Sequence, residues 1–336
     1  MGLLRYTIRR VLQSVPVLLG ILAITFLLTN AIPGNPVEIM LGPQKAAQSP
    51  QAVEAIKAKY GLNEPLPVRF GNYVWAVLHG DLGRSIYYDV PVMQKILERL
   101  PVTLLLLVSS FGFAIATAIP LGVISAKRRN MPTDHVSRVV ALVGVSTPSF
   151  WIGLVLIIVF AYHLGWFPAT NLVLPWADPS TVEGASSRLD VIVTSIKHLA
   201  LPTVSLGTLQ MAAITRIERS AMLEVLSEEY VQLARAYGVQ ERTILRKHAF
   251  RNAQLPVITI VGLQLTSALG GAVLTETVFS ISGMGRLVVT SINNQDYPLV
   301  MGTTLFFGVT FVVGVILTDI SYAYIDPRVS YGEEGQ

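Results

Sequence analysis

The strongest constraint in this sequence is a series of long segments that are nearly free of Asp, Glu, Lys and Arg. About 20 predominantly apolar residues form a helix long enough to cross a bilayer. Backbone polar groups find no water inside a membrane, so spanning segments fold as helices. The sequence therefore predicts an all-α polytopic membrane protein with six transmembrane helices, near residues 9–31, 100–126, 138–162, 197–218, 254–275 and 299–322.

The composition agrees with this class of protein. Of the 336 residues, 52% are hydrophobic and only 14% are charged, whereas an average soluble domain has about a quarter charged residues. Cysteine is absent, which excludes disulfides, thiolate nucleophiles and thiolate metal sites. The net charge of +4 comes from basic residues beside the apolar segments, so it indicates membrane topology and not a nucleic-acid partner.

The distribution of basic residues predicts the orientation. Cytoplasmic loops of membrane proteins are enriched in Lys and Arg. Basic residues precede the first span, follow the second and follow the fourth, so both termini are expected in the cytoplasm. The first apolar run is longer than a signal-peptide core of about 7–15 residues, which favours a retained helix. The residues that set this orientation include Arg5, Arg9, Arg10, Lys127, Arg128, Arg129, Arg216 and Arg219.

Loop lengths divide the chain further. Residues 1–32 are expected to form a cytoplasmic stub and the first helix, and residues 33–98, rich in Pro and aromatic residues, an external subdomain. Residues 99–326 would contain the other five helices, and residues 327–336 a cytoplasmic tail. Pro120 and Pro148 predict kinks in two of the helices.

The cytoplasmic segment between spans four and five is charged yet periodically apolar. Residues 224–252, called the coupling segment below, are expected to form two short helices broken at Gly238, because glycine accepts positive φ at a helix end. Tyr230, Leu233, Ala234 and Tyr237 would share one helix face. Such a segment either lies on anionic lipid or docks a soluble motor protein.

Nucleotide and metal sites are not expected in this chain. A phosphate-binding P-loop requires a Gly-Lys pair, and the sequence contains none, so energy must come from another chain or from an ion gradient. His79 and Asp81 could suggest a metal site, but two ligands do not make one. A turn built by Gly80 and Gly83, with Asp81 bonding its own backbone, is the favoured interpretation.

Several motifs together resemble one known family. Ala234, Gly238 and Leu255-Pro256 are similar to the EAA loop of binding-protein-dependent ABC permeases, although Gln232 and Leu233 replace its usual Glu and Ala. The spacing of this loop resembles the B-type subunit of the dipeptide, oligopeptide and nickel branch. Further similar segments lie at residues 32–36, 79–85, 275–279, 283–286 and 326–328, with Asn35 in place of Asp and Ile281-Ser282 in place of Trp-Pro.

The resemblance implies a type I ABC importer permease in the bacterial inner membrane. Its expected partners are a homologous C-type permease, two ABC ATPase subunits that hold ATP and Mg, and an extracytoplasmic solute-binding protein. No cofactor is expected in this chain, which would be a permease and not an enzyme. Peptides are the favoured cargo, with nickel chelates, glutathione and oligosaccharides left open.

The resemblance and the residue pattern together suggest three groups of functional residues. Contact with the ATPase is assigned to Tyr230, Ala234, Arg235, Gly238, Arg242, Arg246, His248, Arg251, Asn252 and Pro256. The translocation path or gate is assigned to Glu276, Gln264 and Asp319, although local structural roles are preferred for both carboxylates. Binding-protein docking is assigned to His79, Asp81 and Tyr87.

Two other classes of function are less consistent with the sequence. An ion-driven secondary transporter would use Glu276 or Asp319 as its coupled carboxylate, but such transporters usually carry midspan carboxylates and inverted repeats, and the sequence suggests neither. An intramembrane hydrolase is disfavoured because no span pairs a convincing nucleophile with His or Asp.

Overall fold

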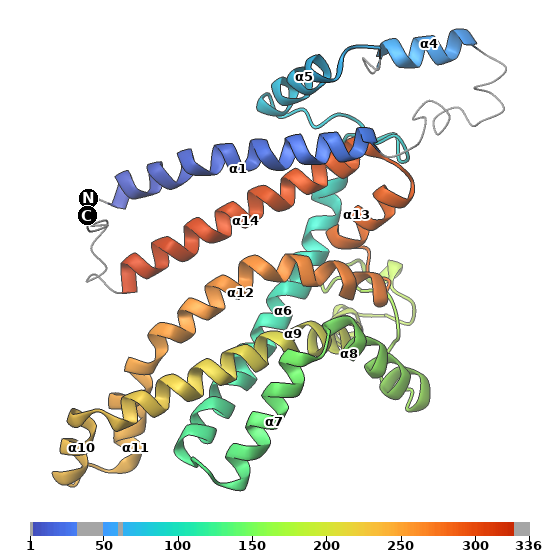
Figure 1. The fold of residues 1–336 in the computed structure, drawn as a ribbon. Coiled ribbons are helices and arrows are strands. Elements are labelled where there is room, and N and C mark those ends of the chain that lie inside the picture. Colours follow the sequence, from blue (N-terminus) through green and yellow to red (C-terminus); the bar gives the residue numbers. More distant parts are fainter. Residues whose placement is uncertain (1–2, 32–49, 60–62, 326–336) are drawn as a thin grey trace. The chain divides into compact units, whose positions relative to one another are not determined.

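The computed structural model describes residues 3–31, 50–59 and 63–325, and these residues are predominantly helical (Figure 1). Within these ranges the β-structure is limited to one isolated antiparallel bridge, Arg84 to Pro91. The expected all-α class is confirmed. The helices are α1 Leu3–Ala31, α4 Pro50–Lys59, α5 Leu66–Leu78, α6 Val92–Lys127, α7 Pro132–Ser146, α8 Ser149–Leu156, η1 Ile157–His163, η2 Pro179–Thr181, α9 Arg188–Ser227, α10 Glu229–Ala236, α11 Glu241–Thr243, η3 Ile244–Phe250, α12 Arg251–Val278, α13 Met284–Asn293 and α14 Tyr297–Ile325.

Four helices are individually long and apolar enough to cross a membrane, and a bent pair of helices makes up to five candidates in the described part of the chain. The four are Thr7–Ala31, Val92–Lys127, Arg188–Ser227 and Tyr297–Ile316, and the pair is Pro132–Ser146 with Ser149–His163. The remaining predicted span, near 254–275, falls on the 28-residue helix α12.

Two helices begin earlier than the charge pattern predicted. α6 begins at Val92, not near residue 100, because Lys95 and Glu98 pair at 2.9 Å on its surface and the helix continues past them. α9 begins at Arg188, nine residues before its expected start, where Ser187 and Asp190 form a reciprocal capping box.

The chain divides into two compact units. Unit 1 comprises residues 1–101 and 283–313, and unit 2 comprises residues 102–282 and 314–336. In unit 1, buried residues from α1, the start of α6, α13 and α14 form one core, which includes Leu22, Ile96, Met284, Leu299 and Leu305. The helix α5 covers this core with partly buried Phe70, Tyr73, Val74 and Val77.

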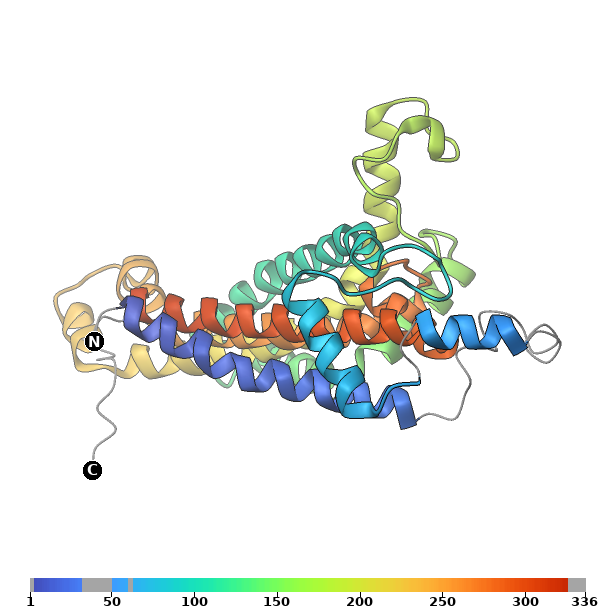
Figure 2. The same cartoon turned by 90° about the horizontal axis from the view of Figure 1, so that it is seen from above.

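The helix α9 is central to unit 2, where it contacts α7, α8, α10 and α12 (Figure 1). Three hydrophobic clusters follow its length: one around Leu206 and Phe279, one around Met211 and Ile214, and one around Met222 and Ala249. In Figure 2, the loop before α9 and its first turns project away from the rest of unit 2.

The predicted kink at Pro148 is a sharp bend. Pro148 lies between α7 and the continuous segment Ser149–His163, formed by α8 and η1, and the axes of the two differ by 105°. The bend is held from α9, because Ser205 Oγ donates a hydrogen bond of 2.7 Å to the carbonyl oxygen of Ser149. Pro120 lies within α6, which continues to Lys127.

The close approach of α6 and α9 requires a glycine at position 207. A Cβ there would lie 2.7 Å from Phe113 Cδ1 and 2.8 Å from the Ser110 carbonyl oxygen, both on α6. A backbone oxygen cannot move aside as a flexible side chain can, so the helices would have to separate.

We predict that Gly207→Ala lowers the free energy of unfolding in detergent by about 1–3 kcal/mol, the usual cost of overpacking. The matched control is Gly112→Ala on α6, where a Cβ would meet no heavy atom within 4 Å. That variant should be neutral or slightly stabilised, because alanine favours helix more than glycine does. Equal thermal midpoints for the two variants would contradict the close approach.

Candidate functional site

The coupling segment lies at the end of unit 2 where α6 and α9 end and α12 begins. The first helix of the segment, α10, stops at a turn in which Gly238 has φ of +74°. Gly238 N donates to the Arg235 carbonyl oxygen at 2.9 Å, and Val239 N to the Ala234 carbonyl oxygen at 3.1 Å. These two bonds form a Schellman motif, so the predicted break at Gly238 is confirmed.

The helix α10 turns its larger apolar residues outward. Val231 is fully buried and anchors the helix on unit 2. Of the predicted apolar face, Tyr230 is 42% exposed, Leu233 56% and Tyr237 79%. The face that the sequence pattern identified is therefore a surface and not part of the core.

The sequence predicted a separate short helix for the second half of the segment, and this prediction is wrong. α11, the π-helix η3 and α12 follow one another without a break from Glu241 to Val278. Ile244 and Ala249 are buried, and Ala249 packs with Ala221, Met222 and Ala253. Apolar packing therefore joins α12 to the coupling segment as one continuous helical stretch.

A hydrogen-bonded cluster joins α10 to the start of α12. Asn252 Nδ2 donates to Tyr230 Oη at 2.9 Å and to the His248 carbonyl oxygen at 2.9 Å. Three of the predicted coupling residues, distant in sequence, are thus brought together. Their contact fixes the orientation of α10 relative to α12.

An ion pair closes the turn at Gly238. Arg235 Nη2 lies 2.9 Å from Glu241 Oε1, and Arg235 Nε donates to Glu241 Oε2 at 3.2 Å. These hydrogen bonds from the guanidinium lower the pKa of the Glu241 carboxyl. Nearly half of each side chain is exposed to solvent, so water screens the ion pair and its contribution to stability is small.

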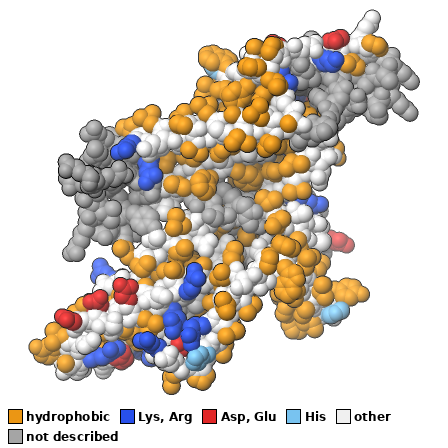
Figure 3. Space-filling model, in the orientation of Figure 1, with side chains coloured by type: hydrophobic (Ala, Val, Ile, Leu, Met, Phe, Trp, Pro, Cys, Tyr) orange, Lys and Arg blue, Asp and Glu red, His pale blue; other side chains and the backbone are white. Residues whose placement is uncertain are grey.

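The other predicted coupling residues are separate from these contacts. Ala234 is half-buried on α10, and Pro256 is exposed one turn into α12. Three guanidinium groups are exposed around the segment, at Arg242, Arg246 and Arg251. Figure 3 shows that Lys and Arg side chains gather near this end of unit 2 on the face in view.

Two buried polar clusters in unit 2 were not predicted. Asp134, fully buried at the start of α7, accepts hydrogen bonds from Arg219 Nε at 2.7 Å, Arg219 Nη2 at 3.0 Å and Ser125 Oγ at 2.6 Å. Asn130 N donates to the same carboxylate at 2.9 Å. This network ties the turn between α6 and α7 to α9.

The second cluster joins α9 to α12. Glu218 is fully buried, and Gln254 Nε2 lies 3.0 Å and 3.3 Å from its two oxygens. Nothing in the sequence pattern distinguishes Asp134 or Glu218 from the charges that usually flank a span. Their partners are far away in the chain, and only packing reveals them.

The residues suggested for the translocation path have different environments. Glu276 was expected to be a helix-end carboxylate at the membrane interface with local bonds, but it is fully buried and accepts a hydrogen bond of 2.6 Å from Thr103 Oγ1 on α6. Glu276 is buried because α12 continues past it to Val278. Gln264 is half-buried on α12, and the Asp319 side chain lies outside the described residues.

The suggested docking loop of unit 1 is an ordered turn. Gly83 N donates to Asp81 Oδ1 at 2.8 Å, and Gly80 and Gly83 have φ of +80° and +82°, as predicted. The buried carboxylate of Asp296 holds the next residues: it accepts from Ser85 Oγ, Ile86 N and Tyr87 N. Tyr87 is 57% exposed. In the described part of the chain, no group of three His, Asp or Glu side chains could hold a metal.

Comparison with known proteins identifies the class. Residues 118–331 match the family model described as binding-protein-dependent transport system inner membrane component, and residues 3–107 match the model of its N-terminal region. The chain belongs to this family of membrane permeases. The curated relatives match over nearly the whole chain. Membership of this family argues against the ion-driven secondary transporter.

Three relatives are representative. The dipeptide transport system permease protein DppB of Alkalihalophilus pseudofirmus is 41% identical over 98% of this chain and its own full length. The oligopeptide transport system permease protein AppB of Bacillus subtilis is 41% identical over 97% of this chain and 99% of its own length. The dipeptide transport system permease protein DppB of Escherichia coli K12 is 36% identical over 98% of this chain and 99% of its own length.

We predict that Asp134→Asn lowers the free energy of unfolding by about 3–5 kcal/mol, because Arg219 would keep its charge beside a neutral partner. The control is Asp178→Asn, an exposed helix-capping position where asparagine also accepts the capping bond. Thermal unfolding in detergent measures both. The double variant Asp134→Leu with Arg219→Met should recover much of the loss, and a double variant as unstable as Asp134→Asn would contradict the ion-pair explanation.

Proposed function

We propose that this chain is the permease subunit of an ATP-driven, binding-protein-dependent importer of dipeptides and oligopeptides. It forms half of a translocation path with a homologous second permease and works by alternating access. Two ATPase subunits bind and hydrolyse ATP with Mg on the cytoplasmic side, and an extracytoplasmic binding protein delivers the cargo. The chain lies in the bacterial inner membrane with six spans and both termini in the cytoplasm.

The single observation that carries the coupling role is the outward apolar face of α10. Leu233 and Tyr237 are more than half exposed, although α10 is anchored through Val231. Such a face beside exposed arginines offers an apolar anchor with a polar rim, the arrangement of protein interfaces. The connected helix from Glu241 to Val278 would carry a displacement of this segment into a membrane span.

Peptide cargo is supported by the relatives, which are named as dipeptide and oligopeptide permeases and match this chain at 41% identity over almost its whole length. The direct test is uptake of a labelled dipeptide by proteoliposomes that contain the purified complex and its binding protein. Uptake should require ATP inside the vesicles. Uptake driven by a proton or sodium gradient without ATP would refute the ATP-driven assignment.

We predict that Leu233→Glu reduces the amount of bound ATPase subunit tenfold or more, because a carboxylate would be desolvated at the centre of the interface. The measurement is the amount of ATPase subunit that copurifies with the tagged permease. Leu233→Met is the matched control, since it keeps the apolar surface and should retain most of the ATPase. If the Glu variant retains as much ATPase as the Met variant, α10 is not the docking surface.

We also predict that Gly238→Val lowers substrate-stimulated ATP hydrolysis severalfold. Valine is strained at a φ of +74°, so the turn that orients α10 would change. Gly184→Val is the matched control: it has φ of +75°, and a Cβ at either position meets no heavy atom within 4 Å. The same loss in both variants would show a general folding defect and no special role of the turn.

A further inference from the structure

The helix α5 of unit 1 has an exposed apolar flank, opposite the side that packs on the core of unit 1. Val68, Trp75 and Leu78 are 48%, 67% and 74% exposed, and their spacing of i, i+7 and i+10 places them on one side of the helix. Gly71 lies among them, and a Cβ there would meet no heavy atom within 4 Å. Figure 3 shows hydrophobic side chains over α5 on the face in view. These four residues, called the outer flank below, have no part in the functions assigned above.

A polar flank lies beside the outer flank. Asn72 and His79 are exposed and lie on the same side of the helix, since they are spaced i and i+7. Asn72 Nδ2 donates to Glu64 Oε2 at 2.9 Å, and the His79 ring centroid lies 4.5 Å from that of Trp75. The helix α5 therefore has one side on the protein core, one exposed apolar side and one exposed polar side. A helix that lies between acyl chains and water has two such exposed sides.

The contact with α1 indicates the depth of α5 in the membrane. Residues 11–29 of α1 contain no charged side chain and rise about 28 Å, close to the hydrocarbon thickness of about 30 Å. Phe26 lies in the last turn of this run, and its ring centroid is 5.4 Å from that of Phe70 on α5. The guanidinium carbon of Arg69 lies 5.9 Å from the same Phe26 ring centroid. The helix α5 is therefore at the level where hydrocarbon meets the lipid headgroups.

The direction of α5 fits this level. Figure 2 shows α5 crossing α1 near the C-terminal end of α1, where the two helices are in contact. Because α1 spans the bilayer, α5 runs along the membrane surface and not through it. Ile24, Leu27 and Leu28 are exposed on the same turns of α1 as Phe26, and such residues of a spanning helix face acyl chains. The outer flank of α5 continues this apolar surface at the end of the span.

From this geometry we propose that α5 is an interfacial anchor, whose outer flank lies in the boundary between headgroups and acyl chains of the extracytoplasmic leaflet. Asn72 and His79 face the water, and Trp75 takes the position at the interface that tryptophan prefers in membrane proteins. The choice of leaflet rests on the proposed topology, in which the N-terminus of α1 is cytoplasmic. The ordered turn at Gly80 and Gly83 follows α5 directly, so the anchor sets the height of this turn above the membrane.

The experiment uses the absence of cysteine from the chain, because single cysteines can then carry a nitroxide spin label. The full-length permease is assembled with cysteine-free partner subunits in nanodiscs of phosphatidylethanolamine and phosphatidylglycerol. Power saturation measures collisions with oxygen, which concentrates in hydrocarbon, and with a nickel chelate, which stays in water. We expect the oxygen-to-nickel collision ratio to be severalfold higher for Trp75→Cys and Leu78→Cys than for Asn72→Cys, the matched control on the polar flank of the same helix.

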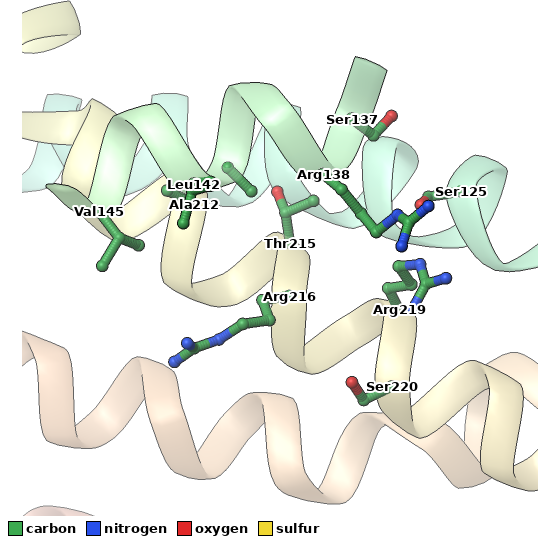
Figure 4. A pocket seen from close by; sticks show the side chains of 11 residues that line it. Ser125, Ser137, Arg138, Leu142, Val145, Ala212, Thr215, Arg216, Arg219 and Ser220 are labelled. Atoms are coloured by element: carbon green, nitrogen blue, oxygen red, sulfur yellow. The ribbon is translucent and has the colours of Figure 1, made fainter. Parts of the chain in front are cut away.

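A label enclosed by protein provides the third reference. Thr215 is buried beside a cavity of about 300 Å³ between α7 and α9 (Figure 4), so a label on Thr215→Cys has room and should collide little with either reagent. A high nickel collision rate at Leu78, equal to that at Asn72, would place the outer flank in water and overturn the anchor. Rates at Trp75 and Leu78 as low as at Thr215 would show a protein surface covering the flank and overturn it too.

The binding protein is the alternative occupant of the outer flank, and its addition tests this directly. Oxygen collisions at Leu78 should stay unchanged when saturating binding protein is added, and loss of these collisions would assign the flank to binding-protein docking. Dipeptide uptake by proteoliposomes of the same complex is a separate measurement. Failure of uptake with a high oxygen ratio would refute the importer function and leave the anchor standing. Normal uptake with a low ratio would refute the anchor alone.

Discussion

The close packing of α9 against its neighbours is the constraint on which unit 2 depends. One helix contacts α7, α8, α10 and α12, and a helix can do so only where side chains are small or interlocked. Gly207 permits contact with α6, and Gly144 on α7 faces Ala212, whose Cβ would lie 2.9 Å from an added Cβ. In hydrocarbon, where apolar association between helices gains little from water, such van der Waals contact is the main source of cohesion.

Buried charge at one end of α9 adds specificity to this packing. Asp134 and Arg219 form an ion pair that two hydrophobic side chains of similar volume could replace with little loss of stability. What the ion pair adds is a defined position for the turn between α6 and α7. The Glu218 and Gln254 contact does the same for α9 and α12. Together the two clusters fix four helices, α6, α7, α9 and α12, at the end where the coupling segment begins.

The sequence predicted those features that depend on local pattern. Apolar runs located the helices, Gly238 located the turn, and the glycines around Asp81 predicted its backbone bond. Features that depend on tertiary partners were missed. Lys95 and Glu98 looked like the boundary of a span but pair on a continuing helix. Asp134 and Arg219 are 85 residues apart, and a periodic pattern cannot show that they meet. Glu276 looked like an interfacial residue because its buried partner Thr103 lies on another helix.

The contacts at this end of unit 2 also determine how a force on α10 would be distributed. α10 follows α9 after a one-residue link at Glu228, and it is bonded to α12 through Tyr230 and Asn252. Because Glu218 joins α9 to Gln254, only two residues further along α12, a push on α10 acts on two helices that are already fixed to each other. Bending one of them alone would break a buried hydrogen bond, which costs more than moving both together. A rocking motion of α9 and α12 as one body is therefore the response that these contacts favour.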